Sequence, residues 1–484
     1  MKKLIIFFAV VMLITEIGCK KDYLDINTNP NSASNTTPEL ELPTALARTA
    51  SMQITNYTFV SGWMGYWAIS GSYALSNNDF TTYQQTSPFG NGLWFTIYDI
   101  LEDYQYVEDQ GRIQGKPFYE AAAKIMKAYE FQQLVDMFGD VPYGDALKGT
   151  ATILPAYANA QDIYDSLILD LGVAIDIMKT SPAETRTGDI FFQGSITNWV
   201  KLANTLKLRI LLRQSQIGRD SYIQGEVAKI TAEGSGFLTV DASANPGYLN
   251  ADGKQNPFWD FNYNTAGTYT NDFWRANQFS ILFLQNNNDS RLGYIYRPVS
   301  GTTFQGNYIG QSVGAVVGSL TSTFGVGVLK SFSQPAVVLS AAESFFLQSE
   351  AALKGWIGDA TAAKTLYEQG VGASFTYLGA GSASAYLGQA GNKEVNWDAA
   401  TDKLALVMRQ KWVAMNTVTP FEAWADYRRL HLPADIPISE SPYVDVPEIP
   451  VRIIYPEIEY LTNATNVPAQ SSSAHHTEKL FWMP

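Results

Sequence analysis

Apolar residues at helical spacing are the feature that most constrains the fold of this 484-residue chain. From Pro117 onward they recur every three or four residues, and Gly139 ends the pattern, as glycine commonly does after a helix. A second segment, 164–178, carries one apolar stripe, and Ser195 is placed to cap a third helix. Further helices are predicted near 337–354, 358–374 and 401–416. Helices paired through short links predict a mainly α fold built from helix hairpins.

Two long stretches of different character interrupt this helical pattern. Residues 52–106 and 241–330 are rich in Gly, Asn, Ser, Thr and aromatic residues, and they show no sustained helical period. Loops of this length in a compact domain are commonly functional or contain irregular strands. We therefore expect two insertions of loops and short strands on the helical framework. Trp94, which stands among large apolar neighbours, is expected to be buried.

The charge of the chain argues against two classes of partner. The sequence has 33 basic and 46 acidic residues, a net charge of −13, and its basic residues form no block. Binding to nucleic acid needs clustered cations that neutralise phosphates, so this balance argues against nucleic acid. It also argues against electrostatic docking on anionic lipid. A hydrophobic content of 46% is enough to bury a large core.

The N-terminal residues have the order of a secretory signal. Lys2 and Lys3 precede an apolar run over 4–14, and Gly18 and Cys19 follow it. We interpret 1–18 as a lipoprotein signal peptide, Cys19 as a lipidated residue, 19–40 as anchor and polar tether, and 41–484 as one domain. The alternative is an ordinary signal peptide with an incidental cysteine, because Glu16 stands where lipoprotein signals usually carry leucine.

Motifs for several kinds of chemistry are missing from the sequence. The single cysteine excludes an internal disulfide, and three histidines assemble no zinc motif or catalytic triad. No phosphate-binding loop is found, so the sequence predicts no metal and no cofactor. Glu343 and Glu350 lie seven residues apart on one helix face, and two carboxylates suffice for glycoside hydrolysis. We favour the interpretation that they brace neighbouring helices.

Seven segments, in order along the chain, resemble those of the SusD/RagB family of nutrient-binding outer-membrane lipoproteins. They are 19–30, 134–143, 189–209, 342–352, 422–430, Arg452 with Tyr455-Pro456, and Phe481-Trp482. The resemblance covers essentially the whole chain after Cys19. It implies a single domain in which tetratricopeptide-like helix pairs form a scaffold that carries loops and short strands. It also implies that Trp199, Asn204, Arg209 and Trp424 pack and pair between helices.

The same resemblance implies a function. Family members lie on the cell surface, where they bind oligosaccharides or, in the RagB-like branch, peptides, and they cap a SusC-like TonB-dependent outer-membrane transporter. They are not enzymes. The residues alone do not decide whether the ligand is a glycan or a peptide, because a peptide is held largely through its backbone and leaves little trace in the sequence of its receptor. Two other functions also stay open: a hydrolase that uses paired carboxylates, and a scaffold that seals the transporter without binding a ligand.

A glycan ligand would require flat aromatic rings beside polar side chains, because a sugar has an apolar C–H face and a hydroxyl edge. The two insertions supply both kinds of residue. Their candidates are Tyr66, Trp67, Tyr73, Asn77, Asn78, Asp79 and Tyr83 in the first, and Trp259, Asn262, Tyr263, Asn264, Tyr269, Asn271, Trp274 and Arg275 in the second. From these we predict that Tyr73, Asn78, Trp259 and Trp274 bind the ligand.

Overall fold

The computed structural model describes residues 36–73, 79–86, 88–182, 186–303, 306–315, 320–444 and 446–484. Residues Pro38–Pro484 form one compact unit, which is mainly α-helical as predicted. Cys19 and Asn78, which were predicted to carry lipid and to bind ligand, lie outside the described residues. Within the described ranges, no helix combines the length and the apolar character needed to cross a membrane.

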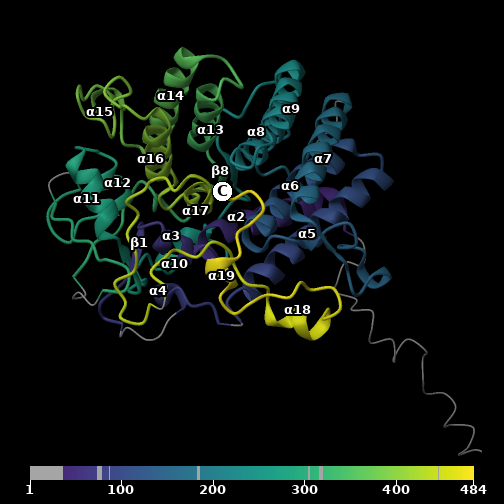
Figure 1. The fold of residues 1–484 in the computed structure, drawn as a ribbon, viewed down its shortest axis with the longest axis horizontal. Coiled ribbons are helices and arrows are strands. Elements are labelled where there is room, and N and C mark those ends of the chain that lie inside the picture. The colour runs from purple at the N-terminus through teal and green to yellow at the C-terminus, as the bar shows by residue number, and fades with distance from the viewer. Residues whose placement is uncertain are drawn as a thin grey trace, which may run out of the picture. The chain divides into compact units, whose positions relative to one another are not determined.

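Long helices that pack against their neighbours in sequence form the framework (Figure 1). They are α2 (Pro38–Thr55), α5 (Asn91–Ile113), α6 (Pro117–Phe138), α7 (Ala160–Thr180), α8 (Ile196–Arg213), α9 (Asp220–Glu233), α13 (Ala341–Leu353), α14 (Ala360–Leu378), α16 (Lys403–Met415) and α17 (Pro420–Leu430). Helix α6 packs between α5 and α7, α8 packs against α7 and α13, and α13 packs against α14 and α16. This arrangement confirms the predicted scaffold of helix pairs.

Local sequence signals explain where these helices begin and end. Pro117 takes the first turn of α6, and Gly139 ends that helix with a φ of 84°. The Asn159 side chain accepts the backbone N–H groups of two first-turn residues of α7. Ser195 caps α8 by accepting the N–H of Asn198, as predicted. The sequence therefore predicted α6 and α8 from their end signals and apolar spacing, and α7 from its apolar stripe alone, without its cap.

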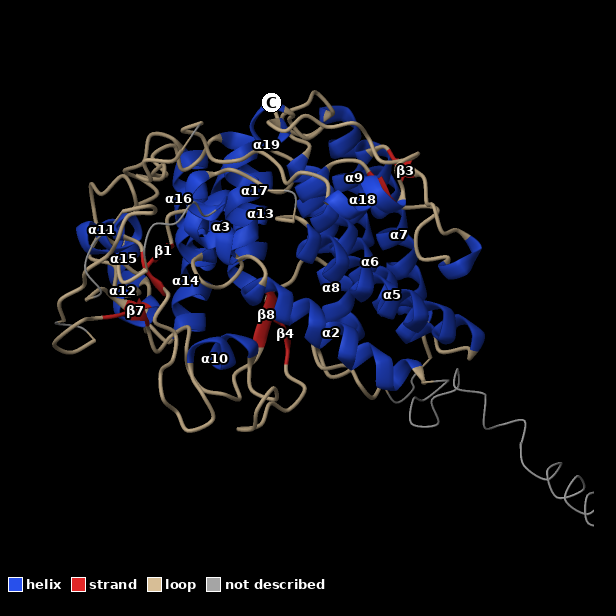
Figure 2. Cartoon of the chain, turned by 90° about the horizontal axis from the view of Figure 1, so that it is seen from below, coloured by secondary structure: helices blue, strands red, loops and turns tan. Residues whose placement is uncertain are grey.

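Short elements occupy the connections between the long helices (Figure 2). The short helices are α3 (Thr58–Trp63), α4 (Asp79–Thr82), α10 (Pro257–Asn262), α11 (Gln278–Asn286), α12 (Leu292–Ile295), α15 (Ser384–Leu387), α18 (Glu457–Thr462) and α19 (Ala474–Thr477), and a 3₁₀ turn covers Gly149–Ala151. The strands form antiparallel pairs: β1 (Trp67–Ile69) with β5 (Trp274–Ala276), β2 (Val141–Pro142) with β3 (Tyr157–Ala158), β4 (Ala242–Ala244) with β8 (Ala336–Leu339), and β6 (Tyr296–Arg297) with β7 (Thr323–Phe324).

Two predicted boundaries are wrong. The helix predicted from residue 337 begins at Ala341, because Val337 and Val338 belong to strand β8 and Ser340 caps the helix. The stretch 52–106 was predicted to lack helical order, yet it contains α3 and most of α5. Helix α5 begins at Asn91-Gly92, a pair typical of turns, and its buried residues alternate with acidic ones.

Buried ion pairs tie the helices together at the centre of the unit. Arg209 and Arg213 of α8 lie 3.4 Å and 2.8 Å from the carboxylate of Glu422 on α17. Arg209 also contacts Glu343 of α13 at 3.3 Å, and Arg213 contacts Asp136 of α6 at 3.2 Å. All these side chains are buried. Burial and the nearby Glu422 raise the pKa of Glu343 to about 7, although Arg209 opposes the rise.

A second part of this network also involves α13 and α17 and adds helix α16. Arg429 of α17 contacts Glu350 of α13 at 2.6 Å and Asp426 at 2.9 Å, and Lys411 of α16 contacts Asp426 at 2.7 Å. Glu343 and Glu350 therefore brace helices, as we favoured from the sequence. Three residues that were predicted to pack inside the fold do so as well. The buried indole N–H of Trp199 donates to the Asp189 carboxylate, and that of Trp424 donates to the Pro450 carbonyl. The Asn204 side chain donates to Glu233.

Candidate functional site

The two insertions meet through the short sheet formed by β1 and β5. Ile69 stands opposite Trp274 in the antiparallel register, and the backbone N–H of Ser70 donates to the Phe273 carbonyl at 2.7 Å. Helix α4 is joined to α3 because the indole N–H of Trp63 donates to the Phe80 carbonyl at 3.1 Å. Segments about 200 residues apart in sequence are thus held against one another.

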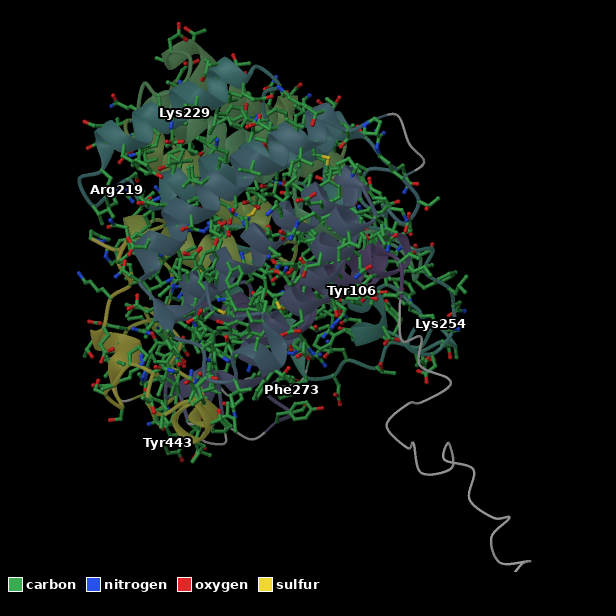
Figure 3. All side chains as sticks on the ribbon, turned by 90° about the vertical axis from the view of Figure 1, so that its right-hand side faces the viewer. Tyr106, Arg219, Lys229, Lys254, Phe273 and Tyr443 are labelled. Carbon is green, nitrogen blue, oxygen red and sulfur yellow. The ribbon has the colours of Figure 1, made fainter. Side chains whose placement is uncertain are left out.

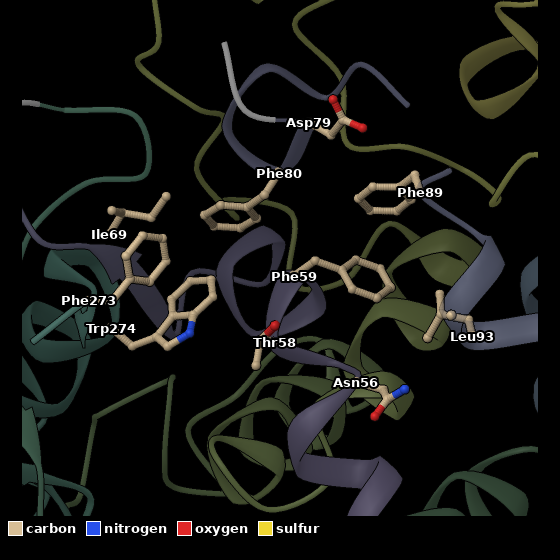
Figure 4. A pocket seen from close by; sticks show the side chains of 11 residues that line it. Asn56, Thr58, Phe59, Ile69, Asp79, Phe80, Phe89, Leu93, Phe273 and Trp274 are labelled. Atoms are coloured by element: carbon tan, nitrogen blue, oxygen red, sulfur yellow. The ribbon is translucent and has the colours of Figure 1, made fainter. Parts of the chain in front are cut away.

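A cavity of about 550 Å³ opens where these segments meet, and we call it the aromatic pocket (Figure 4). Five aromatic side chains line it: Phe59, Phe80, Phe89, Phe273 and Trp274. Asn56, Thr58 and Asp79 add an amide, a hydroxyl and a carboxylate to the same lining. The Asp79 carboxylate is fixed in place because it accepts both the backbone N–H and the hydroxyl of Thr86, at 2.9 Å and 2.5 Å.

Two of the predicted ligand residues lie at this pocket. Trp274 lines it half-buried, and its ring meets the Phe80 ring edge-on with centroids 5.4 Å apart. Tyr73 packs edge-on against Phe273 at 4.9 Å, and its hydroxyl donates to the Asp272 carboxylate. Phe273 lies at the edge of the molecule in Figure 3. The structure therefore brings Tyr73 next to the pocket wall and Trp274 into it.

Trp259 lies outside the lining of the aromatic pocket, on α10. Its ring stacks on Tyr263 with centroids 4.4 Å apart and planes inclined by 19°. Tyr269 meets Tyr263 edge-on at 5.2 Å. Two asparagines of this insertion stabilise the loop from within, because the buried Asn271 side-chain amide donates to the Asn262 side-chain oxygen at 2.9 Å. Trp259 thus belongs to a separate, half-buried aromatic stack.

Three of the other candidate aromatics are buried in the core. The Tyr66 hydroxyl donates to the Trp412 carbonyl at 2.6 Å, and the Trp67 indole donates to the Thr417 hydroxyl at 2.9 Å. The Tyr83 hydroxyl accepts the backbone N–H of Ser439 at 2.8 Å. Their exposed fractions are 0%, 1% and 1%, so these rings hold the insertions to the framework and present no face to a ligand. Trp94 is 3% exposed, which confirms its predicted burial.

Sequence reasoning missed most of the pocket lining, including Phe59, Phe80 and Phe89. One signal could have pointed to it, namely Gly62 inside the short helix α3. A Cβ atom built on Gly62 would lie 1.9 Å from Cε2 of Phe80, so only glycine leaves room for that ring. The close approach of α3 to Phe80 therefore depends on residue 62 having no side chain.

The lining suits a neutral ligand that has one apolar face and a polar edge. Half-buried aromatic rings bind apolar faces, while an amide, a hydroxyl and a carboxylate can each bond to hydroxyl groups. Among the described residues, no cluster of three or more His, Cys, Asp or Glu side chains could hold a metal ion.

Comparisons with known proteins agree with this fold. A SusD-like family model, described as starch-binding and associating with the outer membrane, matches residues 30–456. A SusD-like protein from Bacteroides thetaiotaomicron is 24% identical with a TM-score of 0.75, covering 92% of this chain and 98% of that one. A chitin-binding SusD homolog from Flavobacterium johnsoniae is 21% identical with a TM-score of 0.73, covering 91% and 98%. None of the curated proteins matches the sequence.

Proposed function

The chain belongs to the SusD-like family, and from this premise we propose that it binds oligosaccharide at the aromatic pocket and delivers it to a partner transporter. It would act as a lipoprotein on the outer surface of the outer membrane and cap a SusC-like TonB-dependent transporter as a lid. The alternative ligand is a peptide, as in the RagB-like branch.

The lining of the aromatic pocket carries this proposal. Trp274 and Phe273 can stack on the C–H face of a sugar ring, while Asn56, Thr58 and Asp79 can bond to its hydroxyls. The volume of about 550 Å³ lies within the usual range of small-molecule sites, which is roughly 300–1,000 Å³. Two solved relatives are described as chitin-binding, which supports carbohydrate as the class of ligand to test first.

The test is calorimetric titration of the purified protein with starch-derived oligosaccharides, chitin-derived oligosaccharides and peptides. We expect saturable binding of an oligosaccharide, and Trp274→Ala should weaken it roughly thirtyfold, equivalent to about 2 kcal/mol for a stacking aromatic. Phe95→Ala is the matched control, because Phe95 is an exposed aromatic that does not line the pocket.

Alanine variants of Tyr73, Asn78 and Trp259 then test the other predicted contacts. Binding that survives all four substitutions in a folded protein would place the site elsewhere. Peptide binding that is lost with Trp274→Ala, without any glycan binding, would favour the RagB-like alternative. A protein that binds neither would act only as a seal.

A hydrolase based on Glu343 and Glu350 is the less favoured function. Both carboxylates are buried and contact Arg209 and Arg429, so neither is available to a substrate at the aromatic pocket. We therefore expect no cleavage products when an oligosaccharide that binds is incubated with the protein and analysed by chromatography. Product formation that Glu343→Gln abolishes would overturn this expectation.

The anchor and the lid are tested separately from the ligand. The 16 residues from Lys20 to Asn35 could reach roughly 54 Å when fully extended, which suffices for a hinged lid. Pull-down from native membranes in mild detergent should recover a TonB-dependent transporter with this protein. Recovery of the protein alone, at every detergent and salt condition, would reject the lid model.

A further inference from the structure

A second cavity, of about 600 Å³, lies between the β4–β8 sheet and helices α13 and α14, and we call it the α14 pocket. Figure 2 shows β4 and β8 side by side at this part of the fold. Val240, Pro335, Val337, Phe345 and Ala373 give it largely apolar walls. It shares no lining residue with the aromatic pocket, so it forms an independent cavity.

Two opposite charges line the α14 pocket, and each is held by neutral groups. The Asp241 carboxylate accepts the backbone N–H of Ala341 at 2.8 Å, at the start of α13. The Lys330 ammonium lies 4.0 Å from the centre of the Tyr377 ring and donates to the Tyr377 carbonyl. Asp241 and Lys330 each favour the charged form of the other, so their charges interact through space within the pocket.

A ligand that carries two opposite charges would gain favourable electrostatic interactions with Asp241 and Lys330 in this pocket. Burial raises the pKa of Asp241, and partial loss of water lowers the pKa of Lys330, although the Lys330 residue remains exposed. The two charges partly compensate each other, and a ligand group in direct contact with either one would add to that compensation. Apolar and neutral polar side chains line the same cavity as both charges, so a suitable ligand has a largely apolar body between its own two charges.

We propose that the α14 pocket binds a small zwitterion with apolar side chains, of about the size of a dipeptide. Its ammonium lies against Asp241, its carboxylate lies against Lys330, and its side chains pack on Val337 and Phe345. The cavity of about 600 Å³ is within the range of small-ligand sites.

Calorimetric titration of the purified protein with leucyl-leucine tests the proposal. We expect saturable binding that Asp241→Asn and Lys330→Gln each weaken at least tenfold. Asn at position 241 keeps an oxygen that can accept the Ala341 N–H, so the start of α13 is preserved. N-acetyl-leucyl-leucine and leucyl-leucine amide, which each lack one charge, should bind at least tenfold more weakly than leucyl-leucine.

Two controls make the result specific to this pocket. Lys254→Gln removes an exposed lysine that does not line the pocket and should leave dipeptide binding unchanged. Trp274→Ala should also leave it unchanged, which separates this site from glycan binding at the aromatic pocket. Absence of saturable leucyl-leucine binding would overturn the proposal. Binding that both charge variants leave intact, or that depends on only one end of the dipeptide, would overturn it too.

Discussion

Replacing Gly62 with alanine should both destabilise the protein and deform the aromatic pocket. The added Cβ would lie 1.9 Å and 2.0 Å from Cε2 and Cζ of Phe80, far inside any contact distance that real Cβ atoms show. Phe80 has little room to move away, because the residue is only 6% exposed and its backbone is fixed by the bond from the Trp63 indole N–H to its carbonyl. Overpacking of this kind costs about 1–3 kcal/mol. Since Phe80 contacts Trp274, the pocket wall should move with it.

Urea denaturation and oligosaccharide titration of the same variant measure the two effects. Gly172→Ala is the matched control, because this glycine lies within helix α7 and its added Cβ would meet nothing within 4 Å. Alanine there should be neutral or should stabilise the helix by up to about 1 kcal/mol. If the clash is the cause, Gly62→Ala should cost less in a Phe80→Ala background than in the wild type. An unchanged midpoint and unchanged ligand affinity for Gly62→Ala would refute the reasoning.

Four further substitutions test the core, a surface ion pair and the anchor. Arg429→Met should lower the free energy of unfolding by about 3–5 kcal/mol, because it leaves the buried carboxylate of Glu350 without its partner. Lys364→Met, which breaks the exposed pair with Asp398, should leave the midpoint of the same urea titration nearly unchanged, because water screens an exposed ion pair. Burial raises the pKa of Glu130 from 4.5 to about 8, so the native state keeps a proton that the unfolded chain releases, and stability should fall as pH rises between these values. Glu130→Gln should reduce the difference between urea midpoints at pH 5 and pH 8, and an equal difference in both proteins would contradict the assignment. Cys19→Ala should release the protein from the membrane fraction, whereas unchanged fractionation without incorporation of a fatty-acid label would reject lipidation.

The helices that could be predicted from the sequence are those whose ends are marked by capping or helix-breaking residues nearby in the chain. Helices α6 and α8 follow from Pro117, Gly139 and Ser195, because caps and breakers act within one helical turn. Helix α5 was missed because a turn-like Asn91-Gly92 pair begins it. Its length and its packing against α2 and α6 come from tertiary contacts.

The candidate site was predicted only in part for the same physical reason. Trp274 stood out as an aromatic in an Asn-rich insertion, and the structure places it in the pocket lining. Phe59 and Phe89 did not stand out, because nothing local shows that they face residues near position 274. That proximity depends on the β1–β5 pairing across about 200 residues, and strand register over such a separation leaves little trace in either strand alone.

The shared carboxylates of the buried ion-pair network restrict how this sequence can evolve. Glu422 serves both Arg209 and Arg213, and Asp426 serves both Lys411 and Arg429. Exchanging the charges of any one pair therefore creates a repulsive contact with a third residue. Neutral drift cannot pass through such single exchanges, so these positions are expected to show strong epistasis and to be retained or replaced as a set.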